Sequence, residues 1–261
     1  MRALSIASTG MLAQQLNVEV ISNNIANMNT TGFKRQRASF HDLLYQNVER
    51  TGAASSDSGT VNSNGVQVGV GVRAGAVYRI AEQGDLQSTE NMFDMAIQGR
   101  GYFRIQMPDG ESTYTRAGAF GLSPDGQMVT AQGYTLMPGI SIPQDATDVS
   151  INAQGEVLAM IPGDTGPTVQ GQLEMATFFN EGGLEAIGQN LFKESTASGS
   201  ANVGTPGTDG YGSIIHGMLE TSNVNAVAEI TNLITAQRAY EMNAKVISAA
   251  DEMLSVTSNL K

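Results

Sequence analysis

Two long helical patterns, one at each end of the chain, constrain the fold more than any other feature of the sequence. Residues 3–33 and 224–254 each carry apolar residues at helical spacing, and the first segment has one charged side chain, Glu19. A helix that faces water normally keeps a charged face. The polar positions of the first segment are mostly amides: Gln14, Gln15, Asn17, Asn23, Asn24 and Asn27. Such a helix suits an environment made of other protein, which favours an assembly subunit over an enzyme.

The first helical segment follows a heptad repeat of the coiled-coil type. Its two seam positions are occupied by Leu4, Met11, Val18 and Ile25, and by Ala7, Gln14, Ile21 and Met28. Only Gln14 interrupts the seam, which would be about 40 Å long at 1.5 Å per residue. The turn-forming residues 29–32, which end in Gly32, predict the end of this helix.

The second helical segment has a comparable seam and a second stripe beside it. The seam contains Ile230, Leu233, Gln237, Tyr240, Ala244, Ile247, Asp251 and Leu254, and the stripe contains Ala236, Ala239, Val246, Ala250 and Met253. We expect the two helices to lie side by side. If they paired only with each other inside one monomer, apolar surface would be left in water, so we expect further copies to cover it.

The chain between the helices has the pattern of β-structure. Turn sequences such as residues 108–110 and 123–126 recur from Met92 to Phe192. We expect strands at residues 102–105, 127–130, 173–179 and 213–219, and a flexible segment at residues 195–212. The predicted fold class is α+β, in which N- and C-terminal helices pair as a coiled-coil-like inner domain and carry an inserted, mainly antiparallel β domain.

This pattern divides the chain into three parts. Residues 1–32 plus 222–261 form the terminal helical domain. Residues 33–91 plus 212–221 form a junction with an extended polar arm, which is the low-complexity stretch at residues 51–65. Residues 92–211 form the β-rich domain.

Charge is scarce and unevenly placed along the chain. Charged residues make up 15% of the sequence, against about 25% in a typical globular protein. Residues 1–50 and 220–261 carry net charges of +2 and −2, so the middle holds the whole formal charge of −11. An acidic middle disfavours nucleic acid and anionic lipid as partners. The basic run Lys34–Arg37 predicts a solvated turn or a local salt-bridge partner.

The sequence predicts no catalytic, cofactor or metal site. There is no cysteine, and His41 and His216 have no metal-ligand spacing around them. The tripeptide at residues 164–166 resembles that of aspartic proteases but occurs once, which favours a loop. No stretch reaches the roughly 20 apolar residues of a membrane span, and the N-terminus lacks the pattern of a cleaved Sec signal. We therefore expect a chain that does not span a membrane.

Four motifs resemble those of a known family. Residues 22–34 resemble the N-terminal motif of the flagellar rod and hook axial proteins of bacteria, and residues 222–225 and 236–241 resemble the partner motif at the other end. Residues 94–103 and 114–120 are similar to the β-domain motifs of that family. The resemblance covers essentially the whole chain. Its length and motif order are most similar to the distal-rod members, since hook proteins are usually longer.

The resemblance implies a structural subunit that polymerises helically into the distal rod of the flagellar basal body. Terminal helices would form an inner tube around the export channel, with the β domain outside. The polymer would be a periplasmic drive shaft that transmits torque from motor to hook. Subunits would leave by the flagellar type III export apparatus, without a cleaved signal peptide. Other implied partners are the proximal rod proteins, the hook protein and the surrounding periplasmic and outer-membrane ring proteins; no cofactor is implied.

The expected assembly interface combines seam positions with residues of the terminal motifs. It consists of Leu4, Ala7, Met11, Val18, Ile21, Asn23, Asn24, Ile25, Asn27, Gly32, Phe33, Ile230, Leu233, Gln237, Arg238, Tyr240, Ile247 and Leu254. We expect the motif amides to hydrogen-bond across subunits, or alternatively to cap the helix end. Arg238 would make charge-assisted bonds in the crowded inner layer, or alternatively pair with Glu241 on its own helix.

Three other functions are compatible with parts of the pattern. One is a different flagellar axial component, either proximal rod or hook protein. The second is a β-rich binding module on coiled-coil stalks, such as a surface adhesin, which would form a closed oligomer of fixed size. The third is a cell-wall hydrolase, for which the sequence offers no recognisable catalytic constellation.

Overall fold

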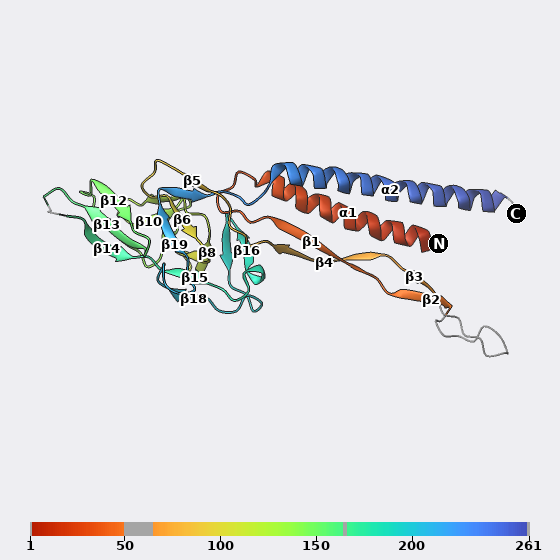
Figure 1. The fold of residues 1–261 in the computed structure, drawn as a ribbon, viewed down its shortest axis with the longest axis horizontal. Helices are drawn as coiled ribbons and strands as arrows, with labels where there is room; N and C mark the ends of the chain where they lie inside the picture. The colour runs from red at the N-terminus through yellow and green to blue at the C-terminus, as the bar shows by residue number, and fades with distance from the viewer. Residues whose placement is uncertain (1, 50–64, 164–165, 260–261) are drawn as a thin grey trace. The chain divides into compact units, whose positions relative to one another are not determined.

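The computed structural model describes residues 2–49, 65–163 and 166–259, which form two compact units (Figure 1). The first, here called the helical unit, comprises Met1–Ile25, Gln36–Tyr78 and Asn225–Lys261. The second, here called the β-rich unit, comprises Ala26–Arg35 and Arg79–Val224. Except for Gly65, the predicted polar arm at residues 51–65 lies outside the described residues, as do the first two residues of the tripeptide at 164–166.

The helical unit contains both predicted helices and two short strand pairs. The helices are α1 (Arg2–Ala26) and α2 (Ala226–Asn259), drawn in red and blue in Figure 1. β1 (Gln36–Asp42) pairs with β4 (Val72–Arg79), and β2 (Tyr45–Glu49) pairs with β3 (Val66–Gly69). Helix α1 ends three residues before the predicted turn formers begin.

The turn after α1 brings the chain into the β-rich unit. Thr30 donates a backbone hydrogen bond to the Asn27 carbonyl over 3.1 Å. Gly32 follows with a φ of +67°, and a Cβ there would lie 2.7 Å from the Ala117 nitrogen. Only glycine combines this backbone conformation with such a close approach.

A nine-stranded sheet is the framework of the β-rich unit. Seven of its strands follow the order β16-β17-β8-β7-β11-β10-β9, and β15 joins β7 to β18. β7 is the hub, because it pairs with β8 along one edge and with β11 and β15 along the other. The bounds are β7 (Tyr102–Gln106), β8 (Ser112–Thr115), β9 (Phe120–Leu122), β10 (Met128–Thr130), β11 (Thr135–Leu136), β15 (Met175–Thr177), β16 (Glu185–Gly188), β17 (Leu191–Lys193) and β18 (Asn202–Gly204).

Smaller sheets complete this unit. A three-stranded sheet has the order β12-β13-β14, and two antiparallel pairs join β6 to β19 and β5 to β20. Their bounds are β5 (Leu86–Ser88), β6 (Met95–Gln98), β12 (Asp148–Ile151), β13 (Glu156–Met160), β14 (Thr168–Gln172), β19 (Ser213–His216) and β20 (Met218–Glu220). The described part of the chain therefore confirms an α+β fold with a mainly antiparallel β region.

Several predicted strands differ in extent from the observed ones. The strand expected at residues 213–219 is divided into β19 and β20 at Gly217, which has a φ of +68°. The strand expected at residues 173–179 is shortened to β15. The segment at 195–212, expected to be flexible, contains β18 and the buried Ser198, whose hydroxyl bonds to the Ser195 carbonyl. Polar composition there reflects turns that are fixed by hydrogen bonds.

The core of the β-rich unit has an apolar part and an aromatic part. The apolar part includes fully buried Met95, Ile97, Phe103, Ile105, Met128, Leu136, Leu173 and Met175. The aromatic part contains Tyr102, Tyr114, Phe178 and Phe192. Tyr114 packs edge-on against Phe178 with ring centroids 4.8 Å apart, and Tyr102 packs edge-on against both phenylalanines. Such edge-to-face pairs stabilise a core beyond their buried area.

Because Tyr102 and Tyr114 are buried in the core, we expect the β-rich unit to lose stability at alkaline pH. Burial raises the pKa of Tyr102, and the Glu181 carboxylate, which accepts the phenol's hydrogen bond, raises it further. Burial also raises the pKa of Tyr114. In the unfolded chain both phenols ionise near pH 10, so the folded state holds more protons above that pH and its stability falls by up to about 1.4 kcal/mol per pH unit for each tyrosine.

Urea unfolding between pH 9 and 11.5 measures this effect. We expect Tyr102→Phe to have a shallower decline than the unchanged chain. Burial lowers the pKa of Lys34, which acts in the opposite direction but equally in both proteins. Equal slopes in the two proteins would contradict the assignment to Tyr102.

Candidate assembly interface

Helix α1 buries more than its predicted seam. Among the seam residues Ala7 and Ile21 are buried, whereas Leu4, Met11, Val18 and Ile25 are partly buried. Ala13 and Val20, which lie off the seam, are buried as well. The helix is therefore covered on more than one side within the helical unit.

Two small residues of α1 allow it to be contacted on two sides. A Cβ on Gly10 would lie 2.9 Å from the amide nitrogen of Asn243 in α2, so Gly10 permits close approach of the two helices. Thr9 accepts a hydrogen bond from the Val72 backbone nitrogen over 3.3 Å, and it lies against Gly71. Helix α1 thus contacts α2 at Gly10 and the β4 segment at Thr9.

Asn24 connects three segments of the helical unit. Its amide nitrogen donates to the Gln36 carbonyl over 2.8 Å and to the Glu229 carboxylate over 3.2 Å, and its oxygen accepts from the Gln36 nitrogen over 2.8 Å. Asn24 is buried, and both of its donors are used inside the chain. We expected bonds across subunits; the fold brings Gln36 and Glu229 close enough to take them instead. Of the other motif amides, Asn23 is exposed, and Asn27 accepts from the Thr30 hydroxyl.

The buried line of α2 is one position away from the predicted seam. Glu229, Ala236 and Ala250 are buried and Asn243 is partly buried, at intervals of seven residues. The predicted seam shares Leu233 and Ile247 with this face, and both are partly buried. Of its other members, Ala244 is partly buried, and the exposed ones are Ile230, Gln237, Tyr240, Asp251 and Leu254. The small alanines face inward because they allow α2 to approach its neighbours closely.

Large apolar side chains therefore remain exposed on α2. Val227 is 76% exposed, Met242 61% and Met253 64%, and Ile234, Val246 and Val256 are also exposed. Several large apolar side chains exposed on one helix favour an interaction surface. Arg238 is exposed too, and among the described residues it forms no ion pair, so the alternative pairing with Glu241 is not observed.

A buried ionic cluster lies in the β-rich unit. The two oxygens of the fully buried Glu220 carboxylate accept from the Lys34 ammonium and from the Arg116 guanidinium, each over 2.6 Å. The Gly84 nitrogen donates to the same carboxylate over 2.9 Å. The prediction that Lys34 would be solvated or locally paired is wrong, because its partner is 186 residues away and both side chains are buried.

Arg116 satisfies its remaining donors with backbone carbonyls. Its terminal nitrogens donate to the carbonyls of Gly101 and Gly99, each over 2.6 Å, and of Ile97 over 3.2 Å. Burial lowers the pKa of Lys34, and the neighbouring Glu220 carboxylate counteracts that effect. Sequence reasoning missed Arg116 and Glu220 as a pair, although Arg116 lies within one of the β-domain motifs.

Gly32 and Phe33, two residues of the expected assembly interface, lie next to this cluster. The Gly32 nitrogen donates to the Glu220 carbonyl over 2.8 Å, and the Phe33 carbonyl accepts from the Asn223 nitrogen over 3.4 Å. Asn223 lies in the motif at residues 222–225. Its side chain bonds to residues 35, 80 and 82.

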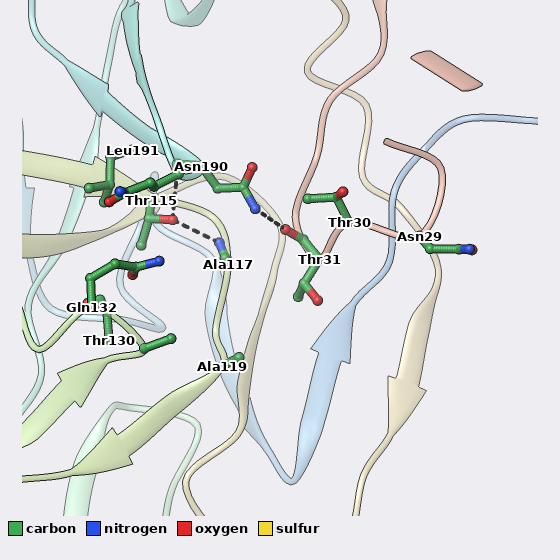
Figure 2. Close-up of a pocket in the computed structure, with 12 residues that line it drawn as sticks. Asn29, Thr30, Thr31, Thr115, Ala117, Ala119, Thr130, Gln132, Asn190 and Leu191 are labelled. Atoms are coloured by element: carbon green, nitrogen blue, oxygen red, sulfur yellow. Dashed lines mark hydrogen bonds between the residues drawn. The ribbon is translucent and has the colours of Figure 1, made fainter. Parts of the chain in front are cut away.

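A polar pocket of about 340 Å³ opens beside the turn that follows α1 (Figure 2). Thr115 accepts a hydrogen bond from the Ala117 nitrogen and donates to the Asn190 carbonyl, while the Asn190 amide donates to the Thr31 carbonyl. Its lining side chains are neutral and none is aromatic. The pocket thus lacks the charged groups that a phosphate, a metal ion or general acid–base catalysis would need.

Two properties of the described residues bear on other functions. Within the described ranges, no group of three or more His, Cys, Asp or Glu side chains could hold a metal ion. In that same part of the chain, neither helix is long and apolar enough to cross a membrane.

Comparison with known proteins gives three family matches along the chain. Residues 4–34 match the family "Flagella basal body rod protein", residues 96–159 match "Flagellar hook protein FlgE/F/G D1 domain", and residues 215–260 match "Flagellar basal body rod FlgEFG protein C-terminal".

Full-length relatives agree with these matches. The chain is 59% identical over all 261 residues, and over the whole relative, to the flagellar basal-body rod protein FlgG of Caulobacter vibrioides. It is 52% identical to the protein of that name in Agrobacterium fabrum, over the full length of both chains. It is 41% identical to that of Bacillus subtilis, covering all of this chain and 99% of the relative.

Proposed function

Since the chain belongs to the flagellar basal-body rod protein family and is a structural subunit of that rod, we propose that it polymerises helically into the distal rod and transmits torque from the motor to the hook. In this proposal α1 and α2 form a coiled-coil-like inner layer around the export channel, and the β-rich unit lies outside. The chain has no enzymatic role, and the three parts inferred from the sequence correspond to inner layer, junction and outer domain.

The exposed apolar surface of α2 is the observation that carries the proposal. A single subunit leaves Val227, Met242 and Met253 in contact with water, although its own α1 already covers another face of α2. Copies of the same chain can cover this surface if each subunit packs α2 against its neighbours. Removing it from water contributes about 25 cal/mol per Å², which favours a polymer over a monomer.

The proposed rod function also implies the partners and the location of the subunit. The rod lies in the flagellar basal body, and we propose that this subunit reaches its periplasmic part through the type III export apparatus without a cleaved signal. It would contact proximal rod proteins at one end, hook protein at the other, and ring proteins around its outer surface. The acidic β-rich part of the chain would face those rings.

Purified full-length chain tests the proposal. We expect open-ended filaments and a gain of helical circular dichroism as concentration rises, whereas a chain trimmed to residues 34–220 should do neither. A closed oligomer of one small size would overturn the proposal and favour a stalked binding module.

A charge placed on the exposed face of α2 should block polymerisation. We expect Met242→Lys to raise the critical concentration for filaments at least about 100-fold, because an unpaired ammonium buried between subunits costs several kcal/mol. The monomer should keep its circular dichroism, since Met242 is exposed in it. Sedimentation velocity and electron microscopy measure the outcome.

Ser150→Lys is the matched control for that substitution. It makes the same change in charge at an exposed position of β12, in the β-rich unit. Filaments that form equally well from the Met242→Lys protein would show that this face of α2 is not an interface.

A further inference from the structure

Two of the places where the chain passes between the β-rich unit and the helical unit are bonded to each other. We call residues 32–35 the N-terminal root and residues 220–223 the C-terminal root, because α1 precedes the first and α2 follows the second. Gly32 donates to the Glu220 carbonyl over 2.8 Å, and Asn223 donates to the Phe33 carbonyl over 3.4 Å. The two roots are therefore paired backbone to backbone.

Side chains of the roots also form hydrogen bonds to a third segment, residues 80–82. The Asn223 oxygen accepts from the Arg35 nitrogen over 2.7 Å, and its amide donates to the carbonyls of Ile80 and Glu82 over 3.0 and 2.9 Å. The Lys34 ammonium also donates to the Glu82 carbonyl, over 2.6 Å. Asn223 thus uses both amide donors and its acceptor at the roots.

Every one of these contacts lies inside the β-rich unit. Lys34, Arg116 and Glu220 are at most 5% exposed, and none of their bonds requires α1 or α2 to be helical. We propose that Lys34, Arg116, Glu220 and Asn223 form a root clamp, which holds the starts of both terminal segments side by side before a subunit is incorporated. This inference rests on the proposed function, because it concerns how the subunit is prepared for polymerisation.

The clamp shortens the loop that must close when the helices pair. Asn24 and Glu229, which bond to each other, are 205 residues apart in sequence. With the roots held, Asn24 is only nine positions from Phe33, and Glu229 is six positions from Asn223. If the N-terminal root is free, the next residue after α1 that is held through its side chain is Gln83, which donates to the Ile97 carbonyl and is 59 residues from Asn24 in sequence. The probability of loop closure falls as about the 3/2 power of loop length. Without the clamp, we therefore expect the paired state of the helices to be roughly tenfold less populated.

Spin labels on the dilute monomer test the clamp directly. The chain has no cysteine, so Met28→Cys and Val227→Cys create two unique labelling sites at exposed positions. We expect one narrow distance distribution by pulsed electron paramagnetic resonance in the otherwise unchanged chain. Asn223→Ala should add a broad population, while amide hydrogen exchange at residues 95–97 stays slow.

Asn152→Ala is the matched control. Asn152 also makes three side-chain hydrogen bonds within the β-rich unit, in the turn between β12 and β13. We expect it to leave the distance distribution narrow; equal broadening would overturn the inference. Loss of exchange protection at residues 95–97 in Asn223→Ala would mean that the β-rich unit itself is disturbed. Lys34→Met is then the test variant, because it keeps the Arg116–Glu220 pair.

Two further results separate the clamp from the proposed function. A broad distribution in the unchanged monomer, with residues 95–97 protected, would overturn the clamp whether or not filaments form. Filaments of the Asn223→Ala protein that appear at the unchanged critical concentration would also overturn it and leave the proposed function standing. We expect that concentration to rise roughly tenfold.

Discussion

Replacing Glu220 by alanine is expected to lower the free energy of unfolding of the β-rich unit by about 3–5 kcal/mol. The substitution leaves the Lys34 ammonium and the Arg116 guanidinium buried without the carboxylate that both contact over 2.6 Å. Urea unfolding of the full-length chain, followed by tyrosine fluorescence, measures the change, since the chain has no tryptophan.

A second ion pair in the same unit provides the control. Arg104 and Glu174 lie 3.4 Å apart and are both partly exposed, so Glu174→Ala should cost less than about 1 kcal/mol. Glu220→Gln, which keeps the shape of the side chain but removes its charge, should fall between the two alanine variants. A cost below 1 kcal/mol for Glu220→Ala would show that the cluster is hydrated in solution.

Gly118→Ala should be at least as damaging, by a steric mechanism. A Cβ at position 118 would lie 1.5 Å from the Met95 carbonyl oxygen, which is backbone and cannot rotate away. The same approach allows the Met95 nitrogen to donate to the Gly118 carbonyl over 3.0 Å. Overpacking of a rigid core costs about 3 kcal/mol or more, so we expect the β-rich unit to unfold at markedly lower temperature.

Gly121→Ala tests whether the effect comes from the close approach alone. Gly121 lies in β9 three residues away, and a Cβ there would meet no atom within 4 Å. We expect Gly121→Ala to change the melting temperature by no more than a few degrees. Similar losses in both variants, measured by circular dichroism during heating, would contradict the assigned cause.

Local patterns in the sequence were sufficient for the two helices and for two of the strands. Helical periodicity predicted α1 and α2, and turn sequences predicted β7 and β10 nearly to the residue. Segments 195–212 and 213–219 were predicted less well. Their strands form only because β15, β6 and β5 lie alongside them, and those partners are distant in sequence.

The candidate interface shows the same division between local and distant information. Spacing alone indicated that α2 carries apolar residues on more than one side. It could not choose between the line through Ile230 and the line through Glu229, because adjacent positions differ by about 100° around a helix. The choice came from Asn24 and Gly10 of α1, which lie against Glu229 and Asn243.

The sequence by itself determined the terminal helices, the uncharged character of α1, the β-rich middle and the family. These follow from spacing, composition and motifs that are read along the chain. Only the tertiary structure decided which face of α2 is buried and that Lys34 and Arg116 share the Glu220 carboxylate. Burial depends on which surfaces meet, and here the partners of a single buried charge come from residues 104 and 186 positions away.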